Sequence, residues 1–283
     1  MKEFSNKVAV ITGGASGIGY AIAEEALARG MRVAIADVEQ AALDQAASTL
    51  SEKGEVLAVR TDVSNAVQMD DFARQTLEHY GSVHLVFNNA GVDGNGPMWE
   101  LTTDDWNWTI GVNLWGVVHG IRVFSKHLVE QNEGHIINTA SIAGLVSAPG
   151  SGPYTATKHA VVAMSECLFG ELRNEGKNVG VSVLCPSFVS TNIYKAGRNR
   201  EDFKDNEEKQ AELRIIEELA GGLFADAMPA RNVAKMTFDA VESNRFYILP
   251  HPEGSTPLIK RRMREILEGK QPSMKGPEEY PIA

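Results

Sequence analysis

A tyrosine and a lysine stand four residues apart in the segment Tyr154-Thr-Ala-Thr-Lys158. In a helix this spacing places a phenol and an ammonium group on the same face. A phenol with its ordinary pKa near ~10 is a poor base at neutral pH, but a neighbouring cation lowers that pKa. A lowering by ~3 units requires ~4 kcal/mol of preferential stabilisation of the tyrosinate. The pair therefore indicates a group that could exchange a proton with an alcohol oxygen.

Two further polar residues accompany this pair. Ser141 comes just after a predicted strand, and Asn113 lies on the preceding helical pattern. A serine hydroxyl at such a place could hydrogen-bond a substrate oxygen and stabilise the charge that develops on it. A tyrosine–lysine pair alone occurs by chance in roughly one sequence in four, so the hypothesis depends on all four residues together.

A glycine-rich turn, Thr12-Gly-Gly-Ala-Ser-Gly-Ile-Gly19, follows the first apolar run of the chain. Glycines in such a turn permit a tight bend, close approach of the backbone to a pyrophosphate and close packing of a helix on a strand. The phosphates then lie at the helix N-terminus, on free N–H groups and the positive end of the dipole. The spacing is G-x-x-x-G-x-G instead of the general G-x-G-x-x-G, but the strand–turn–helix setting predicts a dinucleotide site.

An acidic residue, Asp37, follows the second apolar run, eighteen residues after Gly19. A carboxylate at that place accepts hydrogen bonds from the adenosine ribose and repels a 2′-phosphate. An NADP site would need a nearby cation, and the neighbours Ala15 and Val38 are neutral. We therefore expect NAD in preference to NADP. The same carboxylate could in addition cap the following helix.

Short apolar runs rich in β-branched residues alternate with longer helical patterns. Runs of this kind, apolar on both faces and separated by helices, are typical of a parallel sheet that is covered on both sides. With right-handed crossovers they predict an α/β fold, a doubly wound Rossmann-type sheet of about seven strands. The predicted strands are Val8–Ile11, Val33–Ala36, Val56–Val59, Leu85–Phe87, His135–Asn138, Val181–Leu184 and Phe246–Leu249.

Two segments depart from this alternation. Residues 190–228 carry nine acidic and six basic side chains and interrupt the strand series, which predicts an inserted helical lid with helical patterns such as Ala211 to Leu219. Residues 251–283 are expected to form an irregular tail around one short helix, Leu258 to Leu267. We therefore expect one catalytic domain over residues 1–250, which includes the lid, followed by the tail.

The composition disfavours several other classes of protein. The 283 residues include 27 basic and 37 acidic side chains, a net charge of −10, and an acidic chain without a basic stripe is a poor partner for nucleic acid or anionic membranes. Two cysteines are no disulfide framework, and the seven histidines show no metal-ligand spacing. No apolar stretch has the length of a signal-peptide core or the ~18 residues of a membrane span. We expect a soluble, cytoplasmic protein without a metal.

Together these motifs resemble those of the short-chain dehydrogenase/reductase family, in its compact, single-domain, NAD-dependent form. The resemblance extends from about residue 5 to residue 250. The matching segments are Thr12 to Gly19, Asp37, Asp62-Val63, Asn88-Asn89-Ala90-Gly91, Asn113, Ser141, Tyr154, Lys158 and Pro186 through Thr191. One departure is Ser187, because the family usually has glycine after the proline, and this puts the local shape of the loop in doubt.

The resemblance implies an oxidoreductase that interconverts a secondary alcohol and its ketone by hydride transfer. Its catalytic tetrad would be Asn113, Ser141, Tyr154 and Lys158, with a water held by Asn113 and the positive nicotinamide assisting Lys158. The implied cofactor-binding residues, besides Tyr154 and Lys158, are Gly13, Ser16, Gly17, Ile18, Gly19, Asp37, Asp62, Val63, Asn89, Ala90, Gly91, Pro186, Val189 and Thr191. The family also implies a homodimer or homotetramer, in which long helices around Asp105–Glu130 and Tyr154–Asn174 pair across subunits.

The substrate pocket is predicted to be mostly apolar, without a fixed arginine or lysine to bind an anion. A hydrophobic or aromatic alcohol or ketone fits such a pocket better than a sugar phosphate does. Three segments, the Met-Lys-Glu-Phe start, Gly152-Pro-Tyr and the Pro-His-Pro-Glu ending, resemble those of enzymes that oxidise benzylic alcohols of lignin-derived aryl ethers. Trp99 could be an aromatic platform. The predicted pocket walls are the loop Val92–Met98 and the residues Ile142, Leu145, Val146, Phe188, Ile193 and Tyr194.

Three alternatives remain beside this reading. An NAD-binding sensor or scaffold without turnover would be expected to have a damaged tetrad, and all four residues are intact. An epimerase or dehydratase with the same tyrosine and lysine usually needs a long C-terminal substrate domain, for which too few residues follow the sixth strand. A 3-oxoacyl-carrier reductase is disfavoured by the segment Phe246 to Glu253, where many of those enzymes have a Val-Asp-Gly-Gly sequence.

Overall fold

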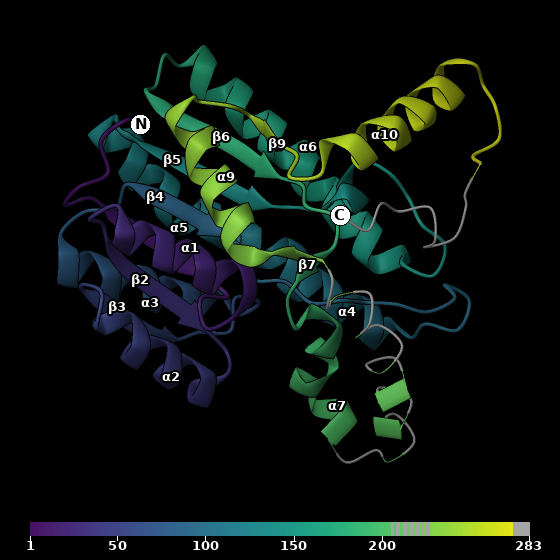
Figure 1. Ribbon diagram of the computed structural model, residues 1–283, viewed down its shortest axis with the longest axis horizontal. Coiled ribbons are helices and arrows are strands. Elements are labelled where there is room, and N and C mark those ends of the chain that lie inside the picture. The colour runs from purple at the N-terminus through teal and green to yellow at the C-terminus, as the bar shows by residue number, and fades with distance from the viewer. Residues whose placement is uncertain are drawn as a thin grey trace.

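Figure 1 shows the computed structural model of the protein. The structure describes residues 1–204 and 227–273, together with Glu207, Gln210, Ala211, Arg214, Ile215, Glu218, Gly221 and Phe224. Most of the predicted helix Ala211 to Leu219 lies outside the described residues.

A seven-stranded sheet forms the centre of the molecule, with the strand order β3-β2-β1-β4-β5-β6-β9. All neighbouring strands are parallel, which confirms the doubly wound sheet and its seven predicted strands. The five residues of β1 are all buried, and burial on both faces explains why the strands are continuous apolar runs in the sequence. The strands are β1 (Val8–Thr12), β2 (Arg32–Asp37), β3 (Val56–Arg60), β4 (Leu85–Asn88), β5 (Gly134–Thr139), β6 (Val179–Leu184) and β9 (Tyr247–Ile248).

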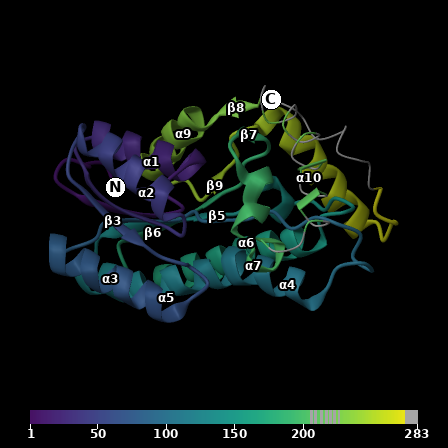
Figure 2. The same ribbon diagram turned by 90° about the horizontal axis from the view of Figure 1, so that it is seen from below.

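Helices cover both faces of the sheet (Figure 2). On one face lie α1 (Gly17–Ala28), α2 (Gln40–Ser51) and α9 (Ala230–Glu242), where Phe87 and Phe238 pack in the core. On the other face lie α3 (Ala66–Tyr80), α5 (Gly116–Gln131) and α6 (Gly152–Asn174), over a core that includes the edge-to-face pair Phe72 and Phe124. Each helix thus buries one apolar side against the sheet and leaves the carboxyl ends of the strands open to loops.

The strand order reverses between β1 and β4, because β1 pairs with β2 on one side and with β4 on the other. In doubly wound sheets ligands bind in the crevice outside the carboxyl ends of the strands at this switch point. The turn after β1 and the loop after β4 border that crevice.

The segment between β4 and α5 is helical but irregular. Helix α4 (Thr103–Ile110) begins with a capping box, in which the Thr102 hydroxyl and the Asp105 carboxylate each bond the other's backbone N–H group. It continues into the π-helical turn η1 (Gly111–Trp115), and α5 follows directly. Such π-turns inside helices are rare and frequent at functional sites, and the buried Asn113 lies in this one.

The chain leaves the seven-stranded sheet after β6 and returns to it at β9, after α9. The short strands β7 (Val189–Ser190) and β8 (Met228–Pro229) pair in parallel, so both ends of the intervening segment lie together. Its described elements are the 3₁₀-helix η3 (Ile193–Asn199) and α7 (Glu201–Lys204). We keep the name lid for residues 190–228.

The last described helix, α10 (Pro252–Leu267), projects from the body of the molecule (Figure 1). It begins six residues earlier than Leu258, the predicted start, because Pro257 lies inside the helix instead of marking its boundary. No helix in the described part of the chain has the length and apolar character needed to cross a membrane.

Candidate active site

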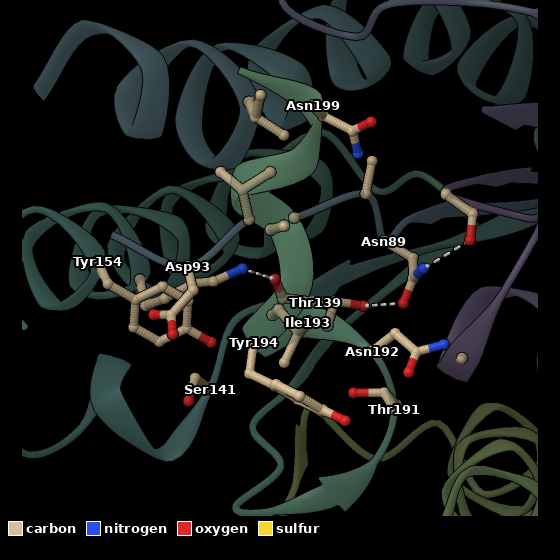
Figure 3. A pocket seen from close by; sticks show the side chains of 18 of the residues that line it. Asn89, Asp93, Thr139, Ser141, Tyr154, Thr191, Asn192, Ile193, Tyr194 and Asn199 are labelled. Carbon is tan, nitrogen blue, oxygen red and sulfur yellow. Dashed lines mark hydrogen bonds between the residues drawn. The ribbon is translucent and has the colours of Figure 1, made fainter. Parts of the chain in front are cut away.

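A cavity of about 900 Å³ lies at the carboxyl ends of the strands (Figure 3). It is lined by Ser141, Tyr154 and Lys158 of the predicted tetrad, and by every predicted cofactor residue except Gly19. Four of the predicted substrate residues also line it, namely Ile142, Phe188, Ile193 and Tyr194. The structure therefore brings most of the predicted site residues to one place.

Leu145 and Val146, in contrast, do not line the cavity. Val146 is buried, and Leu145 packs against an apolar cluster that includes Val117 and Val161. The 3₁₀-turn η2 (Ile142–Gly144) changes the direction of the chain immediately after Ile142, so only Ile142 and Ala143 of this turn face the cavity.

The glycine-rich turn has the geometry of an anion site. Gly13 and Gly17 have φ angles of +66° and +54°, which favour glycine. A Cβ atom on Gly19 would lie 2.0 Å from the Gly13 carbonyl oxygen, so Gly19 packs the first turn of α1 on the loop, which explains why it does not line the cavity. The side chain of Ser16, the N-cap of α1, makes no capping bond. Its hydroxyl and the first N–H groups of α1 fit a phosphate.

Thr12 and Asn89 connect this turn to the loop after β4. The Thr12 hydroxyl oxygen accepts hydrogen bonds from the N–H groups of Asn89 at 3.0 Å and Ala90 at 3.1 Å. The Asn89 side-chain amide donates to the Thr12 carbonyl at 3.1 Å. These bonds hold the glycine-rich turn and the loop after β4 together, and Asn89 and Ala90 also line the cavity.

The carboxylate of Asp37 lies at the end of β2 beside the glycine-rich turn. It accepts hydrogen bonds from the N–H groups of Ala15 at 3.1 Å and Glu39 at 3.2 Å. Burial raises the pKa of Asp37 above its ordinary value, against the lowering effect of these N–H groups. Two bonds leave acceptor capacity on a carboxylate, so Asp37 can accept further hydrogen bonds from a ribose.

Tyr154, Ser141 and Asp93 lie together at one end of the cavity (Figure 3). The N-terminal turn of α6 carries Tyr154, and Lys158 follows one turn later on the same face. The Lys158 Nζ atom lies 5.5 Å from the centre of the Tyr154 ring and donates to the Thr139 carbonyl at 3.0 Å. Ser141 accepts a hydrogen bond from the Ala143 N–H group at 3.1 Å.

Asn113 lies behind this group and is fully buried. Its side-chain oxygen accepts from the Val92 N–H group at 2.8 Å, and its amide nitrogen donates to the Val92 carbonyl at 2.9 Å. A Cβ atom on Gly91 would lie 3.3 Å from the Asn113 oxygen and 3.5 Å from the Lys158 Nζ atom. Asn113 therefore fixes the loop after β4 next to the lysine; the predicted water is a separate role that stays a prediction.

Burial dominates the protonation of the tyrosine and the lysine. It raises the pKa of Tyr154 above the ordinary value, with a further increase from Asp93, while the hydrogen bond with Ser141 lowers it. Burial also lowers the pKa of Lys158 to about 8. In the protein without a cofactor, the pKa of Tyr154 is thus raised and not lowered as expected. The free energy lost when the phenolate is removed from water exceeds the stabilisation by the neighbouring side chains.

Replacing Lys158 by methionine is expected to stabilise the protein at pH 7 without added nucleotide. The difference between the ordinary pKa of 10.5 and the buried value of about 8 corresponds to about 3 kcal/mol against folding. Losing the bond to the Thr139 carbonyl offsets about 1 kcal/mol of this gain.

The pH dependence of this effect has a defined sign. Below pH 8 both folded and unfolded chains hold the lysine proton, and the penalty is complete. Between pH 8 and 10.5 only the unfolded chain holds it, so the wild type gains stability as the pH rises. Urea unfolding at pH 7 and pH 10 measures both effects; a variant that is less stable than the wild type at pH 7 would contradict the prediction.

Two arginines of the lid line the cavity, contrary to the expectation of a pocket without fixed cations. Arg198 donates from Nε to Glu39 at 3.2 Å, and Asn199 donates to the same carboxylate at 3.1 Å. Burial would raise the pKa of Glu39, but these two partners outweigh it and hold the pKa below the ordinary value. The lid is thereby bound to the residue that donates to Asp37.

The second arginine, Arg200, binds the lid to helix α4. Its guanidinium forms ion pairs with Asp105, the capping residue of α4, and with Asp202. It also lies 5.2 Å from the centre of the Trp108 ring and its side chain is only 6% exposed. Both cations are therefore neutralised by acids, so the cavity still has no unpaired arginine among the described residues that line it.

The sequence did not single out Asp93, Trp108, Arg198 or Arg200 as cavity residues. Trp99, the predicted aromatic platform, is 85% exposed and does not line the cavity, where Trp108 is found instead. Position in the loop Val92–Met98 was the only signal for Asp93. For the arginines no local signal exists, because their partners lie far away in the sequence.

The departure at Ser187 is accommodated by the start of α10. The Ser187 N–H group donates to Nδ1 of the buried His251 at 3.2 Å. The carbonyl of the preceding Pro186 accepts from the Ile142 N–H group at 2.8 Å. This loop is therefore fixed on both sides next to Val189 and Thr191, the residues predicted to hold the nicotinamide.

Comparisons with known proteins agree with this geometry. A family model described as short chain dehydrogenase matches residues 7–202. A crystal structure of a short-chain dehydrogenase/reductase from Burkholderia phymatum in complex with NAD is 44% identical, with a TM-score of 0.89, over 97% of this chain and 99% of that chain.

Two curated relatives also match nearly the whole chain. The CLA biosynthesis dehydrogenase/reductase of Lactiplantibacillus plantarum is 37% identical over 280 residues, which are 97% of this chain and 98% of the relative. The C alpha-dehydrogenase of Sphingobium sp. is 32% identical over 289 residues, 98% of this chain and 91% of the relative. Fold, site and relatives lead to one conclusion: the chain belongs to the short-chain dehydrogenase/reductase family of oxidoreductases.

Proposed function

We propose that this protein interconverts a secondary alcohol and its ketone with NAD as the cofactor. One observation carries the proposal: Ser141, Tyr154 and Lys158 meet at one end of a cavity that also contains the glycine-rich turn and the Asp37 carboxylate. An NAD molecule bound along this cavity would supply the hydride acceptor, and a positive charge near the phenol. The remaining steps belong to side chains of the protein.

In the direction of oxidation, the Ser141 hydroxyl would donate a hydrogen bond to the substrate oxygen and hold it beside the Tyr154 phenol. Tyr154, as phenolate, would take the hydroxyl proton while hydride leaves the carbinol carbon. The Lys158 ammonium lies one helical turn away and favours the phenolate. In the reverse direction Tyr154 would return the proton to the developing alkoxide, which Ser141 stabilises.

The choice of NAD over NADP is supported by two acids at the end of β2. Asp37 has acceptor capacity for ribose hydroxyls, and its charge opposes a 2′-phosphate. Arg198, a cation of the lid that lines the cavity, is held by Glu39. The relative from Burkholderia phymatum, crystallised with NAD, supports the same choice.

The apolar side chains that line the cavity from the lid and from the loop after β6 favour a hydrophobic or aromatic small molecule. Phe188, Ile193 and Tyr194 supply that lining, and Phe224 packs on Phe188 and Tyr194. We infer that residues 190–228 act as the substrate lid within one catalytic domain of residues 1–250. We keep the proposal of a homodimer or homotetramer paired through α5 and α6.

A panel of aliphatic and benzylic secondary alcohols, with NADH absorbance as the readout, tests the proposal. We expect turnover with NAD for at least one alcohol and the reverse reaction for its ketone. Enzyme that binds NADH but turns over no alcohol, ketone or 3-oxoacyl thioester would favour the sensor or scaffold. Activity confined to the thioester would favour the carrier reductase.

A further inference from the structure

The carboxylate of Asp93 is the one acid that borders the reacting end of the cavity beside Tyr154 among the residues labelled in Figure 3. Its negative charge acts on the phenol, since it contributes to the raised pKa of Tyr154. The proton exchange proposed above does not use it. A partly buried carboxylate without an ion-pair partner destabilises the fold, which suggests that Asp93 has a functional role at this place.

The side chain of Asp93 is held in place from several directions. Its oxygens accept hydrogen bonds from the Gly94 N–H group at 3.0 Å and from the Asn95 side-chain amide. Asn95 in turn accepts from the Ser151 hydroxyl at 3.0 Å, and Ser151 immediately precedes the helix that carries Tyr154. The carboxylate therefore has a fixed position relative to the phenol.

The two partners of Asp93 are neutral, and its charge remains without an ion pair among the described residues. A carboxylate has about four acceptor positions, and these bonds use two of them. The two acids that hold the lid, Glu39 in the cavity and Asp105 on α4, are each paired with an arginine. Asp93 thus combines a fixed position with acceptor capacity that the protein itself does not satisfy.

We propose that Asp93 determines substrate specificity by accepting a hydrogen bond from a second hydroxyl group on the carbon next to the reacting carbinol. The favoured substrates are then vicinal diols and the corresponding hydroxy ketones, with the apolar group directed toward the lid. Lys158 already places a positive charge at this end, so a neutral hydroxyl is favoured over an ammonium. This inference depends on the proposed alcohol oxidation and specifies its substrate class.

The experiment compares 1-phenylethanol with 1-phenylethane-1,2-diol, which differ by one hydroxyl beside the same benzylic carbinol. The wild type is expected to have a kcat/KM for the diol that is about ten to a hundred times higher, the range for a hydrogen bond to a charged group. D93A and D93N are expected to remove most of this preference, measured as the ratio of the two kcat/KM values. The lost charge beside Tyr154 also changes the pKa of the phenol, but this effect is common to both substrates and leaves the ratio unchanged.

A matched variant separates recognition from loop structure. N95A removes one of the two bonds that fix Asp93 but keeps the carboxylate and its bond to the Gly94 N–H group, so the preference for the diol is expected to be reduced less than in D93A. A wild type that prefers the mono-alcohol, or an unchanged ratio in D93A, overturns the inference while the alcohol oxidation stands. An equal loss for both substrates also overturns it, because Asp93 would then only support the loop.

Two further outcomes are decisive. Faster turnover of 2-amino-1-phenylethanol than of the diol contradicts the choice of a hydroxyl. A wild type that oxidises neither of these alcohols nor any other secondary alcohol overturns the proposed function, and the inference with it. Melting temperatures of the variants within a few degrees of the wild type show that the comparison concerns folded protein.

Discussion

Replacing Tyr154 by phenylalanine is expected to lower kcat for alcohol oxidation by about 10²–10⁴-fold, the usual contribution of a positioned acid or base. The ring packing and the position of Lys158 beside the ring do not require the hydroxyl. The KM for NAD is therefore expected to change by less than about threefold, because the Tyr154 hydroxyl is proposed to act on the alcohol in the transition state and its loss should affect kcat. Steady-state kinetics and NADH fluorescence titration measure the two effects.

A second tyrosine provides the matched control. Tyr80 is also buried, its pKa is raised to about 12 by burial, and its hydroxyl donates to the Val33 carbonyl at 2.9 Å. Tyr80→Phe removes a buried hydroxyl far from the cavity and should cost about 1 kcal/mol of stability without changing kcat. If Tyr154→Phe retained near-wild-type kcat, Tyr154 could not be the proton-exchanging group.

The pH profile adds a test of the same assignment. Burial raises the pKa of Tyr154, so the phenol is mostly protonated at neutral pH. The fraction of phenolate then grows as the pH rises above neutral, and wild-type oxidation should become faster with it. The residual activity of Tyr154→Phe should lack this rise. An identical profile in both proteins would assign the pH dependence to another group.

The sheet was predictable because each strand is buried on both faces and therefore forms a continuous apolar run in the sequence. The cofactor end of the site was predictable for a related reason: the glycine-rich turn and Asp37 act through local backbone geometry directly after two of those strands. Ser141, Tyr154 and Lys158 also occupy positions that short motifs define. Asn113 was found as a residue, but the π-helical turn that holds it was not, since nothing in its periodicity differs from an ordinary helix.

The substrate end was predicted less well, because its walls depend on tertiary contacts. Leu145 and Ile142 are both apolar and three residues apart, yet a single 3₁₀-turn directs one into the core and the other into the cavity. Arg198 meets Glu39 across 159 residues of sequence. No local pattern encodes such a pair, and composition alone suggested a pocket free of cations.

The second large expected effect is a change of cofactor preference, which depends first on Asp37 and then on the ion pair between Glu39 and Arg198. Asp37→Ser removes the ribose acceptor and the charge that repels a 2′-phosphate. Each contribution is worth about one to two powers of ten when a charged hydrogen bond is involved. The ratio of kcat/KM for NADP to that for NAD is therefore expected to rise by about 10²–10⁴.

Adding Glu39→Gln to Asp37→Ser is expected to raise this ratio by about a further tenfold, because Arg198 would lose its ion-pair partner in the same cavity and could bind the 2′-phosphate, a charge-assisted contact. A triple variant that also carries Arg198→Met is the control and should return to the ratio of Asp37→Ser alone. If Glu39→Gln raised the ratio equally with and without Arg198, the effect would come from the lost carboxylate charge and not from the arginine. If Asp37→Ser left NAD preferred as strongly as before, Asp37 would not be the residue that excludes NADP.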